Sequence, residues 1–85
     1  MLMDIIEGVI HALAELADDT SVPKNVREKV NAARGFLGEK DTELSIKVNK
    51  ALAELEEVSE DINIQTYTRT QLWNIASMLE KALLK

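Results

Sequence analysis

The 85-residue sequence contains no cysteine, one proline and one histidine, and its aromatic residues are one each of phenylalanine, tyrosine and tryptophan. Without cysteine there is neither a disulfide framework nor a thiolate metal site, and nucleophilic cysteine chemistry is excluded. Nothing therefore points to secretion, and we expect a cytoplasmic protein. The single histidine excludes a di-iron helical bundle, which needs a Glu-x-x-His motif on each of two helices. We expect no metal and no cofactor.

Long apolar runs and a basic leader are also missing. The first residues, Met1-Leu2-Met3-Asp4, lack the positive charge that precedes the apolar part of a signal peptide. Acidic residues interrupt the apolar stretch that follows, so we predict neither an export signal nor a membrane span. The net charge of -5 argues against a general affinity for nucleic acid or anionic lipid, because both carry the same sign.

The most informative feature that is present is an internal duplication. Adding 42 to a residue number lays the first half of the chain over the second without a gap. Identical residues then coincide at Leu2 and Leu44, Leu13 and Leu55, Glu15 and Glu57, Asp19 and Asp61, Arg27 and Arg69, and Leu37 and Leu79. Further apolar residues coincide without being identical. The sequence therefore predicts one helical hairpin that occurs twice.

Apolar residues recur at spacings of three and four through both halves, which is the pattern of amphipathic helices. This periodicity predicts helices over residues 3–18, 23–37, 42–59 and 65–85, and no strand-like alternation of useful length appears. The predicted inner faces carry Leu2, Ile6, Val9, Ile10, Leu13, Leu16 and Ala17; Val26, Val30, Ala33, Phe36 and Leu37; Leu44, Val48, Ala51, Leu52, Leu55 and Val58; and Leu72, Ile75, Ala76, Leu79, Ala82 and Leu83.

Neither hairpin buries enough apolar surface alone, so each must cover the other. The prediction is an all-α fold, an antiparallel four-helix bundle of two similar hairpins with pseudo-twofold symmetry, forming a single domain over residues 1–85. A more open stack, as in HEAT-type repeats, is the alternative, although solenoids need at least three repeats and this chain has two. Acidic and basic segments alternate along the chain, as side-by-side neighbours in such a bundle require.

The connections carry turn and cap residues. Pro23 suits the first turn of the second helix, where its missing N-H costs nothing. Gly38 is a candidate C-cap of that helix, and Asp41 or Thr42 is a candidate N-cap of the next.

The sharpest polar constellation is Asp19 with Arg27 and its repeat, Asp61 with Arg69. Each pair spans a loop and one helical turn, so we predict a salt bridge that fixes the entry angle of the following helix. Each aspartate is also a candidate cap of that helix. We interpret the four residues as a structural latch, because two carboxylates in separate loops supply no nucleophile and no orienting base. Phosphate binding or catalysis is the alternative.

His11 and the acidic clusters are weaker candidates for metal or acid-base chemistry. Glu7 precedes His11 by one turn, yet no second histidine exists, and a solvated surface histidine is the better interpretation. Acidic residues crowd the ends of the first and third helices at Asp18, Asp19, Glu54, Glu56, Glu57, Glu60 and Asp61. Their spacing lacks the alternating ligands and the central glycine of an EF-hand, so a solvated face partly neutralised by the basic helices is expected.

One basic strip lies on the second helix and comprises Lys24, Arg27, Arg34 and, further round, Lys29. Nucleic-acid readers normally add aromatic stacking residues, and here only Phe36 is near, on the predicted core stripe. Pairing with the acidic first helix explains the strip.

Trp73 lies outside the main apolar stripe of the fourth helix and shares that flank with Leu84. The first helix is also broad, since Met3, Ile5 and Ala14 widen its apolar arc. Surplus apolar surface of this kind marks a bundle edge or a contact with another chain. Tyr67, Trp73 and Leu84 are therefore the candidate interaction surface.

Two blocks resemble a known family. Asp-Thr-Ser-Val-Pro at residues 19–23 and Arg-Thr-x-x-Trp-Asn-Ile at residues 69–75 look like the signature of uncharacterised protein family 0147, a set of small archaeal proteins. The resemblance covers essentially the whole chain. It implies a compact four-helix bundle with no assigned activity and brings no catalytic residues.

No reactive constellation accompanies the wide apolar arcs. We therefore expect a small non-enzymatic protein that acts through protein contact or self-association. The first alternative is a ligand- or metal-binding protein or small enzyme that uses the acidic loop ends with Arg27 and Arg69. The second is nucleic-acid contact along the basic strip.

Overall fold

Four helices make up the structure, a computed structural model that describes the backbone of residues 2–84 and the side chains of residues 5–84. They are α1 (Leu2–Ala17), α2 (Lys24–Leu37), α3 (Leu44–Ser59) and α4 (Thr66–Leu83). Residues 2–84 contain no strand. The prediction of an all-α fold is confirmed, and each boundary lies within about two residues of its expected place, the usual scatter at helix ends. The parts of the prediction that concern the side chains of Leu2 and Met3 lie outside the described residues.

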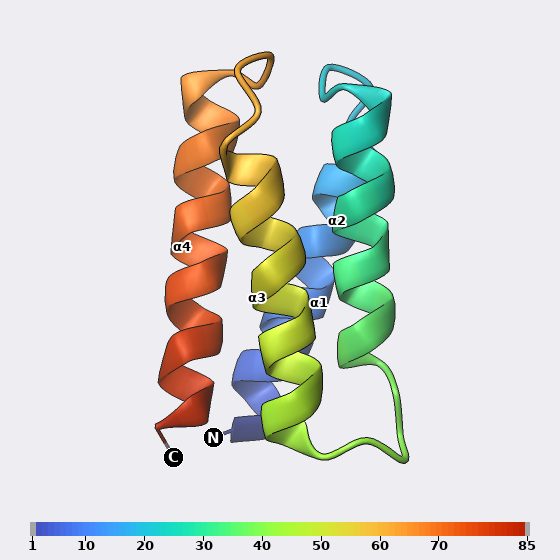
Figure 1. Ribbon diagram of the computed structural model, residues 1–85, viewed down its shortest axis with the longest axis vertical. Coiled ribbons are helices and arrows are strands. Elements are labelled where there is room, and N and C mark those ends of the chain that lie inside the picture. The colour runs from blue at the N-terminus through green and yellow to red at the C-terminus, as the bar shows by residue number, and fades with distance from the viewer. Residues whose placement is uncertain (1, 85) are drawn as a thin grey trace.

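The helices run alternately up and down and close into a bundle (Figure 1). Each helix contacts its two neighbours around the ring, which closes through the contact between α1 and α4. The diagonal pairs α1–α3 and α2–α4 make no backbone contact in residues 2–84. An open stack of hairpins would instead place α1 against α3 and α2 against α4. The two short loops, 18–23 and 60–65, lie at one end of the bundle, and the connection 38–43 lies at the other (Figure 1).

The core repeats the duplication of the sequence. Both members of eight apolar pairs related by the 42-residue shift are buried: Ile6 and Val48, Val9 and Ala51, Leu13 and Leu55, Leu16 and Val58, Val22 and Ile64, Val30 and Leu72, Ala33 and Ile75, and Leu37 and Leu79. These residues belong to one contiguous cluster to which all four helices contribute. The two hairpins therefore share a single interior, and this repeated burial supports the predicted pseudo-twofold relation.

Two residues assigned to inner faces lie at the rim. Phe36 is only half-buried, and the ammonium of Lys50 lies 5.4 Å from its ring centroid. Leu83 is exposed. Both were placed by periodicity alone, which locates the centre of an apolar stripe better than its edges.

The predicted side-chain caps are absent in the described chain. The residues that precede α2, α3 and α4 are Pro23, Glu43 and Gln65, and none forms a side-chain cap hydrogen bond. Gly38 does follow α2, as predicted, but with right-handed backbone angles (φ -84°, ψ -5°) that any residue adopts. No described helix is long and apolar enough to cross a membrane.

Candidate functional site

Arg27 and Arg69 occupy equivalent places, one turn into the helix that follows each short loop. The Nε of Arg27 donates to the carbonyl oxygen of Val22 at 3.0 Å. The guanidinium of Arg69 donates twice, from Nε to the carbonyl of Ser59 at 3.1 Å and from Nη2 to the carbonyl of Asp61 at 2.9 Å. Both arginines therefore tie their helix to the backbone of the preceding loop. Arg69 also reaches the last residue of α3.

The predicted salt bridges to Asp19 and Asp61 do not form: among the described side chains, neither aspartate lies within ion-pair distance of its arginine. Asp19 instead accepts hydrogen bonds from the backbone N-H and the hydroxyl of Ser21, at 2.9 and 2.7 Å. The Oδ1 of Asp61 likewise accepts from the backbone N-H of Asn63 at 2.8 Å. Each is an Asx turn, in which the carboxylate orders its own loop two residues further on.

These hydrogen bonds also lower the pKa of both aspartates. The side-chain and then the backbone hydrogen bond from Ser21 hold the pKa of Asp19 below its ordinary 3.8, and the nearby charge of Arg27 adds a smaller lowering. For Asp61 the backbone N-H of Asn63 is the main cause of its lowered pKa. The two loops are therefore best ordered when their aspartates are ionised.

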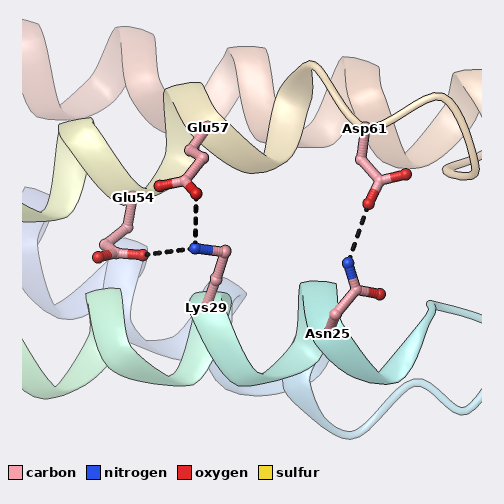
Figure 2. A network of polar contacts seen from close by, with 5 residues as sticks. All are labelled: Asn25, Lys29, Glu54, Glu57 and Asp61. Carbon is pink, nitrogen blue, oxygen red and sulfur yellow. Dashed lines mark hydrogen bonds and ion pairs between the residues drawn. The ribbon is translucent and has the colours of Figure 1, made fainter.

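A second set of polar contacts joins the two hairpins (Figure 2). The Nδ2 of Asn25 in α2 donates to Oδ2 of Asp61 at 3.1 Å, across 36 residues of sequence. One turn further along α2, the ammonium of Lys29 lies 2.8 Å from Oε1 of Glu57 and 3.9 Å from Oε2 of Glu54, both in α3. The hydrogen bond to Glu57 is the largest cause of a raised pKa at Lys29. These contacts connect α2 with α3 and its following loop.

Sequence reasoning missed this set. The expected pairing of the basic strip with the first helix is wrong for Lys29, whose carboxylate partners lie on α3. Arg34 forms no ion pair with the side chains of residues 5–17 of α1, and its guanidinium donates to Asn31 on its own helix at 2.6 Å. The duplication did not indicate a role for Asn25, because the equivalent residue in the second half is Tyr67. The sequence feature that could have indicated these contacts is the pair Glu54 and Glu57, which share one face of the third helix.

Reactive or metal-binding groups do not converge among the described residues. His11 is exposed, and its Nε2 lies 3.5 Å from Oε1 of Glu15, one turn later, rather than beside Glu7. No group of three or more histidine, aspartate or glutamate side chains in the described part of the chain is placed to hold a metal ion. The described acidic side chains and His11 therefore form no cluster of metal ligands.

The candidate interaction surface consists of exposed side chains on two sides of α4. Tyr67, Trp73 and Leu84 are 71%, 59% and 86% exposed. At about 100° per residue, Trp73 and Leu84 lie within about 20° of each other around the helix axis, and Tyr67 lies about 120° away. The phenol oxygen of Tyr67 accepts a hydrogen bond from Gln71 at 3.4 Å. Trp73 and Leu84 therefore share a face that Tyr67 does not.

Trp73 forms one wall of a groove between α3 and α4. The groove has a volume of about 320 Å³ and is open to solvent along one side. It is lined by Leu55, Glu56 and Ser59 of α3 and by Leu72, Trp73, Ala76, Ser77 and Glu80 of α4. We call it the Trp73 groove. Leu55 and Leu72 belong to the buried core and are each 1% exposed, so the apolar surface that the groove offers comes mainly from Trp73 and the half-buried Ala76.

Comparison with known proteins identifies relatives whose function is not described. The model of the uncharacterised protein family UPF0147 matches residues 3–82. The chain is 32% identical over 77 residues to a UPF0147 protein of Methanosarcina mazei, covering 91% of this chain and 83% of that one. It is 39% identical to one of Pyrococcus horikoshii, covering 89% and 83%, and 35% identical to one of Thermoplasma volcanium, covering 94% and 92%. No solved structure matches.

Proposed function

The chain belongs to the uncharacterised protein family UPF0147, and we propose that it is a small non-enzymatic helical bundle that acts through protein contact, either with a second copy of itself or with another protein. We also propose that it works in the cytoplasm. The lack of cysteine suits a reducing compartment, where disulfides do not contribute to stability.

One observation carries the proposal: the exposed apolar surface is concentrated on α4. Seven large apolar side chains are exposed among the described residues, and five of them lie on α4 or at its C-cap. The seven are Ile46, Ile62, Tyr67, Trp73, Met78, Leu83 and Leu84. Single exposed apolar residues are ordinary, but Trp73 and Leu84 share one face of α4, and apolar residues gathered on one face mark a contact surface. Tryptophan and tyrosine are also the residue types most enriched where binding energy concentrates.

The two alternatives lack a comparable observation. A ligand site built on Arg27 and Arg69 would need their guanidinium groups, which already donate to backbone carbonyls. Nucleic-acid contact along α2 would need Lys29, which faces two carboxylates of α3. Neither alternative is therefore proposed as a second function.

The experiment measures the mass of the protein in solution and the environment of Trp73 together. Trp73 is the only tryptophan, so its fluorescence reports on this one site. We expect either a mass above the 9.5 kDa monomer in light scattering at low micromolar concentration, or a complex with a second protein. In both cases the Trp73 emission should shift to the blue as the complex forms.

Trp73→Ala should weaken that association, whereas Ile46→Ala, a matched change at an exposed apolar residue of α3, should leave it unchanged. A strict monomer would contradict the proposal if its Trp73 emission stayed constant with concentration and no partner were retained by the wild type but lost by Trp73→Ala.

A further inference from the structure

The Trp73 groove combines an apolar floor with two carboxylates at its rim. Trp73 and Ala76 supply the accessible apolar surface above the buried Leu55 and Leu72, and the exposed side chains of Glu56 and Glu80 line the groove from α3 and α4 respectively. Neither glutamate forms an ion pair with any side chain among residues 5–84. Their charges are therefore available to a molecule that enters the groove.

Trp73 is a third group in the groove, beside the two glutamates, that attracts a cation. Its indole is 59% exposed and lies in the same groove as both glutamates. The face of an indole attracts lysine and arginine side chains, and among aromatic side chains tryptophan does so most strongly. A cationic side chain above an apolar floor thus finds two carboxylates and an aromatic face in one place, and its aliphatic stem can cover the apolar surface.

The duplication shows that these features are not needed to build a hairpin. In the first half, the residues equivalent to Trp73, Glu56 and Glu80 are Asn31, Ala14 and Gly38. The apolar floor, by contrast, is kept in both halves, with Leu13 and Val30 buried in place of Leu55 and Leu72. The hairpin therefore folds with or without the tryptophan and the two acids, and only the second copy carries them.

A second copy of the chain is a poor occupant of the groove. The chain has a net charge of -5, and a twofold dimer through this face would bring four carboxylates together. The basic helix α2 has the right charge, but no large apolar side chain on its described surface is exposed. Nucleic acid is repelled by the same carboxylates. The charge of the groove thus favours a foreign, basic protein segment.

We propose that the Trp73 groove is the docking site for a cationic amphipathic helix of another protein, which presents an aliphatic side chain to the groove floor and lysine or arginine to Glu56 and Glu80. This inference rests on the proposed function and names the chemistry of the partner. It corresponds to the recognition of an amphipathic helix in a groove, with the acidic rim setting the preference for basic sequences.

The test uses the full chain and three synthetic helical peptides without tryptophan. The first peptide contains leucine, lysine and arginine in an amphipathic pattern, the second has glutamate at each basic position, and the third has glutamine at each leucine. We expect the first peptide alone to bind and to shift the Trp73 emission to the blue. Calorimetry should show a dissociation constant that rises with salt and rises about tenfold or more in Trp73→Ala.

The decisive comparison is between two doubly neutralised variants. Glu56→Gln with Glu80→Gln removes the acidic rim, and Glu7→Gln with Glu28→Gln removes the same charge at exposed positions outside the groove. The first pair should weaken binding of the basic peptide about tenfold, and the second should leave it within about twofold of the wild type. All variants should keep the wild-type circular dichroism, because every replaced side chain is exposed.

The assignment of a cationic partner would be overturned if the two doubly neutralised variants weakened peptide binding equally. It would also be overturned if the glutamate peptide bound as tightly as the basic peptide. A dimer in light scattering that buries Trp73 and excludes the basic peptide would also overturn it, yet would leave the proposed function in place. Failure of every peptide together with a monomer that retains no partner would count against both.

Discussion

Asn25 of α2 donates a hydrogen bond to the carboxylate of Asp61, and this contact joins the two hairpins at the end of the bundle where the chain does not connect them (Figure 2). The covalent link between the hairpins, residues 38–43, lies at the opposite end (Figure 1). Lys29 with Glu57 extends the same contact one turn along α2. The hairpins are therefore held at one end by the backbone and at the other by polar side chains.

We expect Asn25→Ala to loosen this polar end without unfolding the bundle. Asp61 would lose its partner from the other hairpin but keep the Asx turn to Asn63. Amide hydrogen exchange should therefore accelerate in residues 60–65, while the buried helical amides stay as slow as in the wild type. Asn74→Ala, at an exposed position of α4 outside this contact, is the control. Equal acceleration in both variants would show that Asn25 does not hold the loop.

The two equivalent arginines should differ in their contribution to stability. Arg69 donates two hydrogen bonds to backbone carbonyls and Arg27 donates one. We expect Arg69→Ala to lower the free energy of unfolding by about 2 kcal/mol and Arg27→Ala by about 1 kcal/mol, as measured by urea denaturation. Arg69→Lys should recover less than half of the loss, because an ammonium cannot reproduce the fixed fork of a guanidinium.

An equal loss in the two alanine variants would mean that the second hydrogen bond of Arg69 adds nothing to stability. Full recovery with lysine would mean that charge near the loop, rather than hydrogen-bond geometry, is the stabilising factor.

The hydrophobic pattern was sufficient to predict the fold. Leu13 and Leu55 lie at the centres of their stripes, and both are almost fully buried, as periodicity required. Burial of an apolar face is a collective effect of many residues, so single errors such as Leu83 at a stripe edge do not change the architecture. The repeat of the pattern further indicated that the two halves would share one core.

The polar contacts could not be predicted in the same way. An exposed side chain has several possible partners within reach. The interaction energies with these partners differ by too little for a sequence pattern to indicate which contact forms. Asp19 was expected to meet Arg27 or the N-terminus of α2, yet the nearer Ser21 offers two donors that need no long side chain to be ordered. The recurrence of Asp19 and Arg27 indicated where the loops are fixed but not which atoms fix them.

The free energy of unfolding should decline at both extremes of pH, and a different set of ionisable groups should cause each decline. The folded-state pKa values of Asp19 and Asp61 lie below the ordinary 3.8, so near that pH the unfolded chain binds more protons than the folded one. Their contribution is present above about pH 3.8 and is lost as the pH falls through the folded values. Lys29 behaves in the opposite sense. Its pKa is raised above 10.5, so its contribution is present below that pH and is lost as the pH rises through the folded value.

Urea midpoints measured across the pH range check both directions. Asp19→Asn with Asp61→Asn should reduce the slope on the acid side and leave the alkaline side unchanged. Lys29→Met should do the reverse. If both variants kept the wild-type slopes on the acid and alkaline sides, the pH dependence would come from other groups.

The shared interior can be tested by equal truncations in the two hairpins. Leu13 is 0% exposed and Leu55 is 1% exposed, and they are equivalent under the 42-residue shift. Leu13→Ala and Leu55→Ala should each cost about 2 to 5 kcal/mol, the sum of lost apolar burial and the cavity that remains. Ile46→Ala, at a 47% exposed position, should cost less than about 1 kcal/mol. Because a domain of this size has only about 4 to 13 kcal/mol in total, either leucine variant should show a clearly lower urea midpoint. Losses below about 0.5 kcal/mol at both leucines would mean that the apolar stripes do not meet in a common core.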